Sequence, residues 1–206
     1  MPTSPDELHA FLRTRRSIRR FRPDPVADEV IARILATATH APSAHNLQPW
    51  RFVIVGADDP SAQIPSVRTR LAQALTSSLR ADMTSAGAPA SEIEKRITTS
   101  LRRIEEAPVI ILLCRDRSAV RADTPEEHIM SIQSTAAAGT YLVLAAHAEG
   151  LGANWICWPL YAQEETREAL SLPESWEPQA MYFLGYLGEE PKSREGKNLE
   201  EVVKVL

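Results

Sequence analysis

Residues 124–150 read TPEEHIMSIQSTAAAGTYLVLAAHAEG, and this stretch decides the fold. Thr124, followed by Pro125 and two glutamates, is typical of a helix start, because threonine caps free backbone N–H groups and proline suits the first helical position. The second half is almost wholly apolar, and Gly150 is expected to follow a helix that ends near residue 149. A helix that is apolar all round must be buried on every side. In a chain this small, we expect a second copy to supply part of that cover.

Strands are expected on both sides of this helix. Segments rich in β-branched, aromatic and other apolar residues are typical of strands. Four occur: WRFVIVG from residue 50, APVIILLCRD from 107, ANWICW from 153 and AMYFLGYLG from 180. The predicted order is helix, helix, strand, helical insert, strand, helix, strand, helix, strand. Strands interspersed with helices favour an α+β fold in which helices cover a sheet.

The remaining helices lie in the first third of the chain and in an insert. Ser4 is expected to cap a helix over about 5–14, and Asp24 with Pro25 is expected to start the next one. Residues 57–107 are rich in Ala, Ser, Arg and Glu, and predict helices over 65–83 and 89–108. With no internal repeat or clear boundary, residues 1–206 are predicted to form one domain that carries this helical insert.

Composition excludes several classes of function. The 206-residue chain has a formal net charge of -4, so it lacks the basic balance of a nucleic-acid-binding protein. The N-terminus has no apolar signal-peptide core, and no apolar run reaches the ~20 residues of a membrane span. Cys114 and Cys157 do not have metal-type spacing, and no metal site is expected. We expect a soluble cytoplasmic protein.

Two basic clusters stand at opposite ends of the chain. The first surrounds Ser17 and the second surrounds Ser193, and their cations are Arg15, Arg16, Arg19, Arg20, Arg22, Lys192, Arg194 and Lys197. Guanidinium, ammonium and hydroxyl groups together suit a phosphate monoester. GLGANW, from residue 150, is not a dinucleotide-binding motif, because Trp155 replaces the third glycine and a helix precedes it. No nucleophile–base pair is evident.

The loop between the second helix and the first strand is unusually polar. The segment APSAHNLQPWRFVIV, residues 41–55, packs Pro42, Ser43, His45, Asn46 and Gln48 before its strand. A turn needs only two or three such residues. We expect Pro49 to hold Gln48 extended, and the remaining polar groups to serve a ligand.

These segments carry a family resemblance. RTRRSIRRFRPDPV from residue 13, APSAHNLQPWRFVIV from 41, EGLGANWICWPLY from 149 and LGYLGEEPKSR from 184 are similar to successive motifs of the FMN-dependent nitroreductase family. Within it, the chain most resembles the flavin-binding C-terminal domain of the bifunctional coenzyme F420 biosynthesis enzyme. The resemblance implies a mainly antiparallel central sheet flanked by helices. It also implies a homodimer with two FMN sites at its interface and the helix 125–149 at its core.

The resemblance also assigns site residues. Arg15, Arg16 and Ser17 would hold the FMN phosphate and ribityl groups, with Arg19 by the pyrimidine edge. Lys192 and Arg194 would complete the phosphate site. Pro42, Ser43 and Asn46 would reach the flavin of the other subunit. Ile156, Cys157 and Trp158 would line the isoalloxazine ring. No catalytic side chain is implied, because FMN N5 carries the chemistry.

The implied function is ping-pong hydride transfer from NAD(P)H through FMN N5 to an electron-poor small molecule such as a nitroaromatic or a quinone. Three alternatives remain open. The chain could be a reductase of an F420-type deazaflavin, a flavin-fragmenting enzyme that makes a cobalamin lower-ligand base, or a flavin or F420 binding protein without turnover. The fold alone does not choose among them, and neither the acceptor nor the preferred nicotinamide can be read from the sequence.

Overall fold

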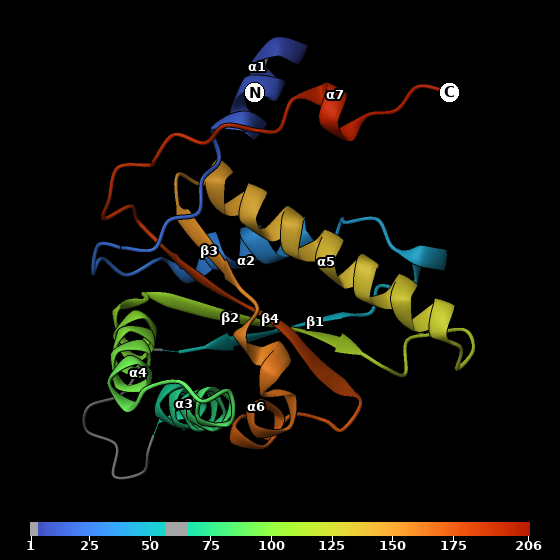
Figure 1. Ribbon diagram of the computed structural model, residues 1–206. Coiled ribbons are helices and arrows are strands. Elements are labelled where there is room, and N and C mark those ends of the chain that lie inside the picture. The colour runs from blue at the N-terminus through green and yellow to red at the C-terminus, as the bar shows by residue number, and fades with distance from the viewer. Residues whose placement is uncertain (1–3, 57–65) are drawn as a thin grey trace.

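A four-stranded antiparallel sheet forms the centre of the computed structural model, which describes residues 4–56 and 66–206 (Figure 1). Its strands lie in the order β1-β2-β4-β3. Their bounds are β1 Trp50–Val55, β2 Val109–Asp116, β3 Gly152–Ile156 and β4 Trp176–Gly185. β2 is buried along its whole length, because helices cover both of its faces.

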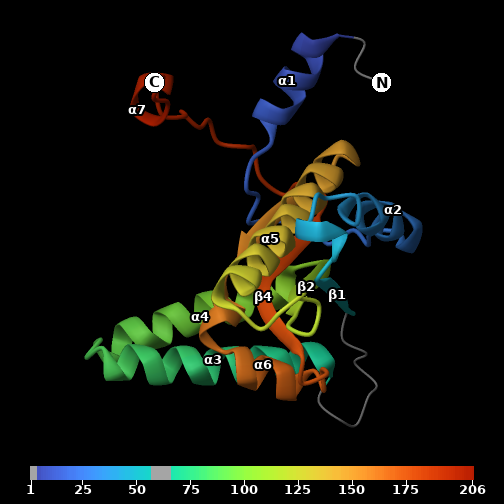
Figure 2. The same cartoon turned by 90° about the vertical axis from the view of Figure 1, so that its right-hand side faces the viewer.

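Helices form a layer on each face of the sheet (Figures 1 and 2). One layer holds α2 (Asp28–Ala38) and the long α5 (Pro125–Ala148); the other holds α3 (Val67–Ser85), α4 (Ala90–Glu106) and α6 (Gln163–Ala169). We call the first the α5 face and the second the α3/α4 face. Alternate residues of β2 and β4 point to the two faces, as the pleat of a strand requires. Ile111 and Tyr182 thus pack on the α5 face, while Leu112 and Met181 pack on the α3/α4 face.

The terminal helices stand apart from these layers. Figure 2 shows α1 (Pro5–Thr14) and α7 (Leu199–Val202) projecting from the body at the end where α5 finishes. Two short 3₁₀ helices, η1 (Ala44–Asn46) and η2 (Trp158–Tyr161), precede β1 and follow β3. The exposed apolar side chains of α1 and of the C-terminal segment therefore have little protein to pack against in a single copy.

Most helix starts follow the expected capping chemistry. Ser4 accepts from the backbone N–H of Glu7 in a complete capping box, and Thr124 accepts from the N–H of Glu127. Gly150 has a φ of 73°, as expected of the residue just beyond a helix end. The prediction that Asp24 and Pro25 start the second helix is wrong. Asp24 pairs with Arg22, Val26 packs into the core, and α2 begins at Asp28.

The predicted α+β fold with an antiparallel sheet flanked by helices is confirmed. α3 and α4 occupy the region where two insert helices were expected; residues 57–65 of that region lie outside the described residues. One face of α5 remains exposed, and its apolar side chains include Ile129, Ile132 and Tyr141. The expectation that this helix is covered on every side is therefore not met within a single chain.

Among the described residues, only α5 is long and apolar enough to cross a membrane, judged by length and composition. Its most hydrophobic window has a mean hydropathy of 1.3. Half of that window is buried inside the fold, as in a core helix, and α5 packs on α2 and β2.

Candidate functional site

Backbone pairing fixes the arginine-rich segment that follows α1. Ser17 forms an isolated parallel bridge with Ala153 at the start of β3, and Phe21 forms an antiparallel bridge with Leu187 beyond β4. This close approach needs Gly188, because a Cβ there would lie 2.7 Å from the carbonyl carbon of Phe21. The segment 15–22 is thereby placed beside the residues that follow β4.

The two basic clusters meet in one cavity of about 390 Å³, which we call the basic cleft. The residues that line it are Arg15, Arg16, Ser17, Ile18, Arg19, Glu189, Glu190, Lys192, Ser193 and Arg194. Its two halves, residues 15–19 and 189–194, are far apart in the sequence. The sequence-based prediction that these clusters act together thus has a common location in the structure.

Positive charge in the basic cleft lacks compensating ion pairs. Within residues 4–56 and 66–206, no carboxylate lies within salt-bridge distance of its arginines or of Lys192. Burial, and then the cations of Arg194 and Arg16, lower the pKa of Arg15. A guanidinium in such surroundings is stabilised by a bound anion.

The cleft residues have different tasks. Arg16 donates to the carbonyls of Arg13 and Arg15, and its Nε lies 3.0 Å from the carbonyl oxygen of Lys192, so it ties the two halves together. Glu189 accepts from the backbone N–H of Arg19 at 2.6 Å. Sequence reasoning missed this carboxylate, which holds the arginine segment in place. Arg15, Lys192, Arg194 and the two serines remain as groups that suit a phosphate.

A second cavity, of about 310 Å³, lies on the α3/α4 face. We call it the donor pocket, because the arginines that line it donate hydrogen bonds. The residues that line it are Leu79, Arg96, Ser100, Arg103, Ile156, Cys157, Trp158, Tyr161 and Phe183. It opens where β3 ends, whereas the basic cleft lies where β3 starts. The three steps along the strand from Ala153 to Ile156 span about 10 Å. The two cavities are therefore close enough to serve opposite ends of one elongated ligand.

The donor pocket combines three predicted residues with others that sequence reasoning missed. Ile156, Cys157 and Trp158 were expected to line a flavin ring, and all three lie here. The indole N–H of Trp158 is buried without a hydrogen-bond partner among the described residues. The missed α4 residues recur at helical spacing, 96, 100 and 103, a signal that could have placed them on one face.

The polar loop before β1 is strained. His45, Asn46 and Gln48 have φ angles of 54°, 56° and 49°, a region that L-residues rarely adopt. The expectation that Pro49 holds Gln48 extended is wrong, because the backbone N–H of Gln48 instead donates to the Ser43 hydroxyl. Backbone strain of this kind persists where surrounding contacts impose it and is common at functional sites.

This loop does not reach the basic cleft of its own chain. Ala44 donates to Ser134 in the first half of α5, while His147 near the end of α5 lies in a smaller cavity beside Arg15. The 13 residues from Ser134 to His147 span about 20 Å of helix. Pro42, Ser43 and Asn46 are thus separated from the cleft residues of their own chain, and their contact with the flavin of the other subunit stays a prediction.

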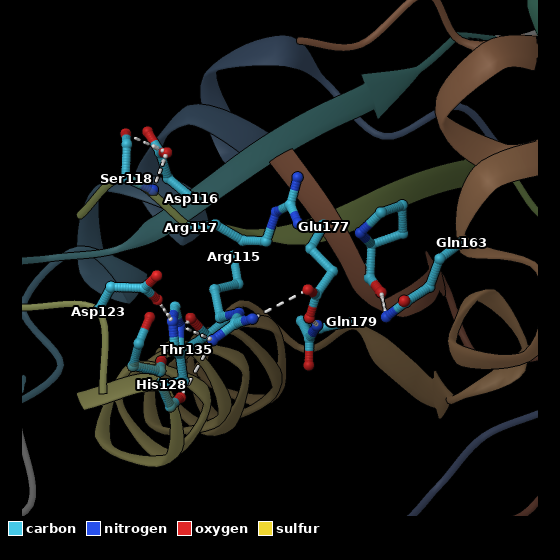
Figure 3. Close-up of polar contacts among 12 residues, drawn as sticks. Arg115, Asp116, Arg117, Ser118, Asp123, His128, Thr135, Gln163, Glu177 and Gln179 are labelled. Carbon is cyan, nitrogen blue, oxygen red and sulfur yellow. Dashed lines mark hydrogen bonds and ion pairs between the residues drawn. The ribbon is translucent and has the colours of Figure 1, made fainter. Parts of the chain in front are cut away.

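A separate polar cluster sits where β2 and β4 meet the start of α5 (Figure 3). Buried Arg115 lies 2.9 Å from Glu177 and 3.2 Å from the His128 ring, which in turn lies 2.6 Å from Asp123. These contacts join α5 to the sheet, and the Nε of Arg115 is left buried without a hydrogen-bond partner among the described residues. Among the described residues, no group of three or more His, Cys, Asp or Glu side chains could hold a metal ion.

Comparisons with known proteins show which family and which solved structures this chain resembles. The model of the nitroreductase family matches residues 12–186. A provisionally named NADH dehydrogenase/NAD(P)H nitroreductase of Methanothermobacter thermautotrophicus is 30% identical over 92% of this chain and 82% of its own. The 5,6-dimethylbenzimidazole synthase of Rhodospirillum rubrum is 31% identical over 92% and 86%. A provisionally named nitroreductase of Desulfovibrio desulfuricans, crystallised with FMN, matches at a TM-score of 0.73 and 27% identity over 98% of each chain.

Proposed function

The chain belongs to the nitroreductase family, and on that premise we propose that it is an FMN-dependent oxidoreductase that uses NAD(P)H to reduce an electron-poor small molecule, such as a nitroaromatic or a quinone. The observation that carries this proposal is the basic cleft, in which unpaired cations from both ends of the chain surround one cavity. The similar D. desulfuricans protein, crystallised with FMN, supports the choice of cofactor.

The residues of the basic cleft fit the phosphate end of FMN. Arg15, Lys192 and Arg194 supply charge, and Ser17 supplies a hydroxyl, while Arg16 holds the two halves at the required separation. Hydrogen bonds from charged donors to phosphate are shorter and stronger than neutral ones. Arg19 lies on the same segment and would face the pyrimidine edge, where its fixed charge would stabilise added electron density.

The donor pocket fits the ring end. Ile156 and Trp158 provide apolar surface, which would exclude water from the reacting face and strengthen electrostatic interactions there. When bound, FMN would supply the redox chemistry, accepting a hydride equivalent from NAD(P)H and passing it to the acceptor. No acid–base pair is required from the protein, in agreement with the absence of one from the sequence motifs.

A second copy of the chain would complete the site. The strained loop with Pro42, Ser43 and Asn46 lies about 20 Å along α5 from the cleft of its own chain, so its proposed flavin contacts require another subunit. The exposed Ile129, Ile132 and Tyr141 of α5 offer an apolar surface for that subunit. We therefore include a homodimer with FMN at its interface in the proposal.

Flavin binding tests the proposal directly. Protein purified from FMN-supplemented cells should show flavin absorbance and oxidise NAD(P)H when a nitroaromatic or a quinone is added. Arg15→Ala and Lys192→Ala should each weaken FMN binding by about 1.5–3 kcal/mol, the value of a hydrogen bond to a charged group. Arg20→Ala is the matched control, because Arg20 lies on the same segment but does not line the cleft.

Two results would contradict the proposal. If the protein contains no flavin and none can be added back, the oxidoreductase assignment fails. If Arg15→Ala and Lys192→Ala both bind FMN as tightly as the unaltered chain, the phosphate assignment fails even where flavin is present.

The R. rubrum relative supports a second candidate, a flavin-fragmenting enzyme that makes a benzimidazole. Incubating the reduced flavoprotein with oxygen and analysing the products separates the two functions. Loss of FMN with release of a benzimidazole would indicate fragmentation, whereas recovery of intact FMN would support reduction of an external acceptor.

The closer resemblance to the F420 domain gains no support from the relatives named above and stays a prediction. Including F420-type ligands among the acceptors tests it. Flavin binding without turnover of any acceptor would indicate a binding protein.

A further inference from the structure

We propose that the donor pocket selects acceptors that carry an anionic group on a planar aromatic ring, and that Arg96 and Arg103 bind the anion. This inference rests on the proposed function and adds a substrate class to it. The observations behind it are the positions of the two arginines, their lack of ion pairs among the described residues, and the apolar side chains that line the same pocket.

Arg96 and Arg103 lie on one face of α4. A separation of seven residues is almost two turns of α-helix, so both side chains project from the same side, with Ser100 between them. All three line the donor pocket together with Trp158 and Tyr161, which come from the segment after β3. Two cations and two aromatic side chains thus line one cavity of about 310 Å³.

The two arginines have no carboxylate partners within residues 4–56 and 66–206. Other arginines of α3 and α4 do have such partners. Arg102, one position away on α4, lies 3.8 Å from Glu106, and Arg80 of α3 pairs with Glu94. Pairing therefore occurs outside the pocket and is missing inside it. A pocket wall with unpaired cations attracts anions, because the cost of removing an anion from water is offset there by nearby positive charge.

Hydrogen-bonding groups in this pocket are mainly donors. The guanidinium groups of Arg96 and Arg103 donate hydrogen bonds and cannot accept them. Ser100 adds a hydroxyl that can also donate. A ligand that satisfies them carries oxygen acceptors, and the apolar side chains of Leu79, Ile156 and Phe183 favour an aromatic body. An aromatic carboxylate meets both requirements.

The anion could belong to the acceptor or to the phosphates of NAD(P)H, since one pocket would serve both in a ping-pong cycle. We assign it to the acceptor, because a cavity of about 310 Å³ lies at the small end of the range for ligand pockets, and the FMN ring would fill part of it, so the remaining space suits a one-ring acid better than a dinucleotide. The experiment below separates the two sources.

The test compares 4-nitrobenzoate with the uncharged, nearly isosteric 4-nitrobenzamide. In the FMN-loaded protein, kcat/KM should be higher for the acid, and Arg96→Gln or Arg103→Gln should reduce that preference about tenfold or more. Lys95→Gln and Arg102→Gln are matched controls: the two residues have the same seven-residue spacing on α4, turned one position away from the pocket. Both should retain the preference.

A reductive half-reaction without acceptor separates the sources of the anion. NADPH, NADH and the uncharged 1-benzyl-1,4-dihydronicotinamide are each mixed anaerobically with every variant. If Arg96→Gln and Arg103→Gln slow reduction by NAD(P)H but not by the uncharged reductant, and leave the acceptor preference intact, the arginines bind the dinucleotide and the acceptor assignment is overturned.

Calorimetric titration with benzoate and benzamide gives a readout that does not depend on turnover. Tighter binding of benzoate, lost in Arg96→Gln and Arg103→Gln, supports the inference even if no flavin binds and the proposed function fails. Equal affinity for acid and amide in the unaltered protein, with flavin bound, overturns the inference and leaves the proposed function standing.

Discussion

The two faces of the sheet differ in packing: the α5 face is closely packed, whereas the α3/α4 face contains a cavity. On the α5 face, Gly139 of α5 lies so close to the Tyr182 ring that an added Cβ would be 2.0 Å from the phenolic oxygen, and Arg115 is buried against Glu177 and His128. On the α3/α4 face, the helices leave the donor pocket open beside Trp158, and its arginines have no carboxylate partners among the described residues.

This difference shows how one small sheet serves both stability and chemistry. Close packing leaves no room for a ligand on the α5 face, so its polar groups pair with one another, as Arg115 does with Glu177, or stay without a partner among the described residues, as the Tyr182 hydroxyl does. A cavity loses packing contacts, and its polar groups are free to bind a ligand. Of the four predictions below, the second and third test this contrast between the faces, while the first concerns the core beneath the donor pocket and the last concerns the end of α5.

The largest effect is expected in thiol reactivity. Burial, and then Glu177, raise the pKa of Cys114 to about 12, so at pH 8 only about one thiol in 10⁴ is ionised. Cys157 is exposed at the donor pocket. A thiol reagent should therefore modify Cys157 and leave Cys114 intact in the folded protein, with Cys157→Ser abolishing the reaction. Modification of Cys114 at a comparable rate would show that the core beneath the pocket is open as well.

The next effect concerns the buried ion pair. Glu177→Gln should lower the free energy of unfolding by about 3 kcal/mol, because it leaves the Arg115 guanidinium buried without its carboxylate. Glu94→Gln on the α3/α4 face is the comparison: its pair with Arg80 is exposed, and the urea midpoint should barely change. Equal changes in midpoint for the two variants would remove the proposed contrast between the faces.

A smaller effect should follow from adding a methyl group at Gly139, where the Tyr182 ring leaves no room for it. Gly139→Ala should destabilise by about 1–3 kcal/mol through overpacking against Tyr182, even though alanine favours helix. Adding Tyr182→Phe removes the colliding oxygen, which has no hydrogen-bond partner among the described residues, and should restore part of the stability. Thermal unfolding of both variants measures this. A Gly139→Ala protein as stable as the unaltered chain would show that the α5 face can yield.

The smallest effect is a pH dependence at the end of α5. Burial and the Arg15 and Arg16 cations lower the pKa of His147, which stacks on Phe11. The unfolded state therefore binds the proton more readily, so stability from neutral His147 is complete above pH ~6.5 and is lost as pH falls below it.

Melting temperatures between pH 7.5 and 5.5 check this sign. The unaltered chain should lose more stability on acidification than His147→Gln does, while His9→Gln, on the exposed side of α1, should behave like the unaltered chain. Identical slopes for all three proteins would mean that His147 does not titrate within the folded contact.

Local patterns predicted much of the fold and half of the candidate site. The capping residues Ser4 and Thr124 and the apolar run of β2 depend on near neighbours, and all three predictions are confirmed. The two basic clusters were visible as charge density. Arg96 and Arg103 were not recognised, because an arginine on a charged helix has the same local pattern whether it faces solvent or a cavity.

The sequence by itself determined which segments become helices and strands, because hydrogen bonding, capping and side-chain periodicity act over a few residues. Only the tertiary structure decided that Arg15 and Lys192 line one cleft and that two arginines of α4 line the same pocket as Trp158. It also decided the φ of Gln48, where contacts with Ser43 outweigh the preference set by Pro49. These outcomes depend on packing between elements far apart in the chain, and such contacts leave no pattern in neighbouring residues.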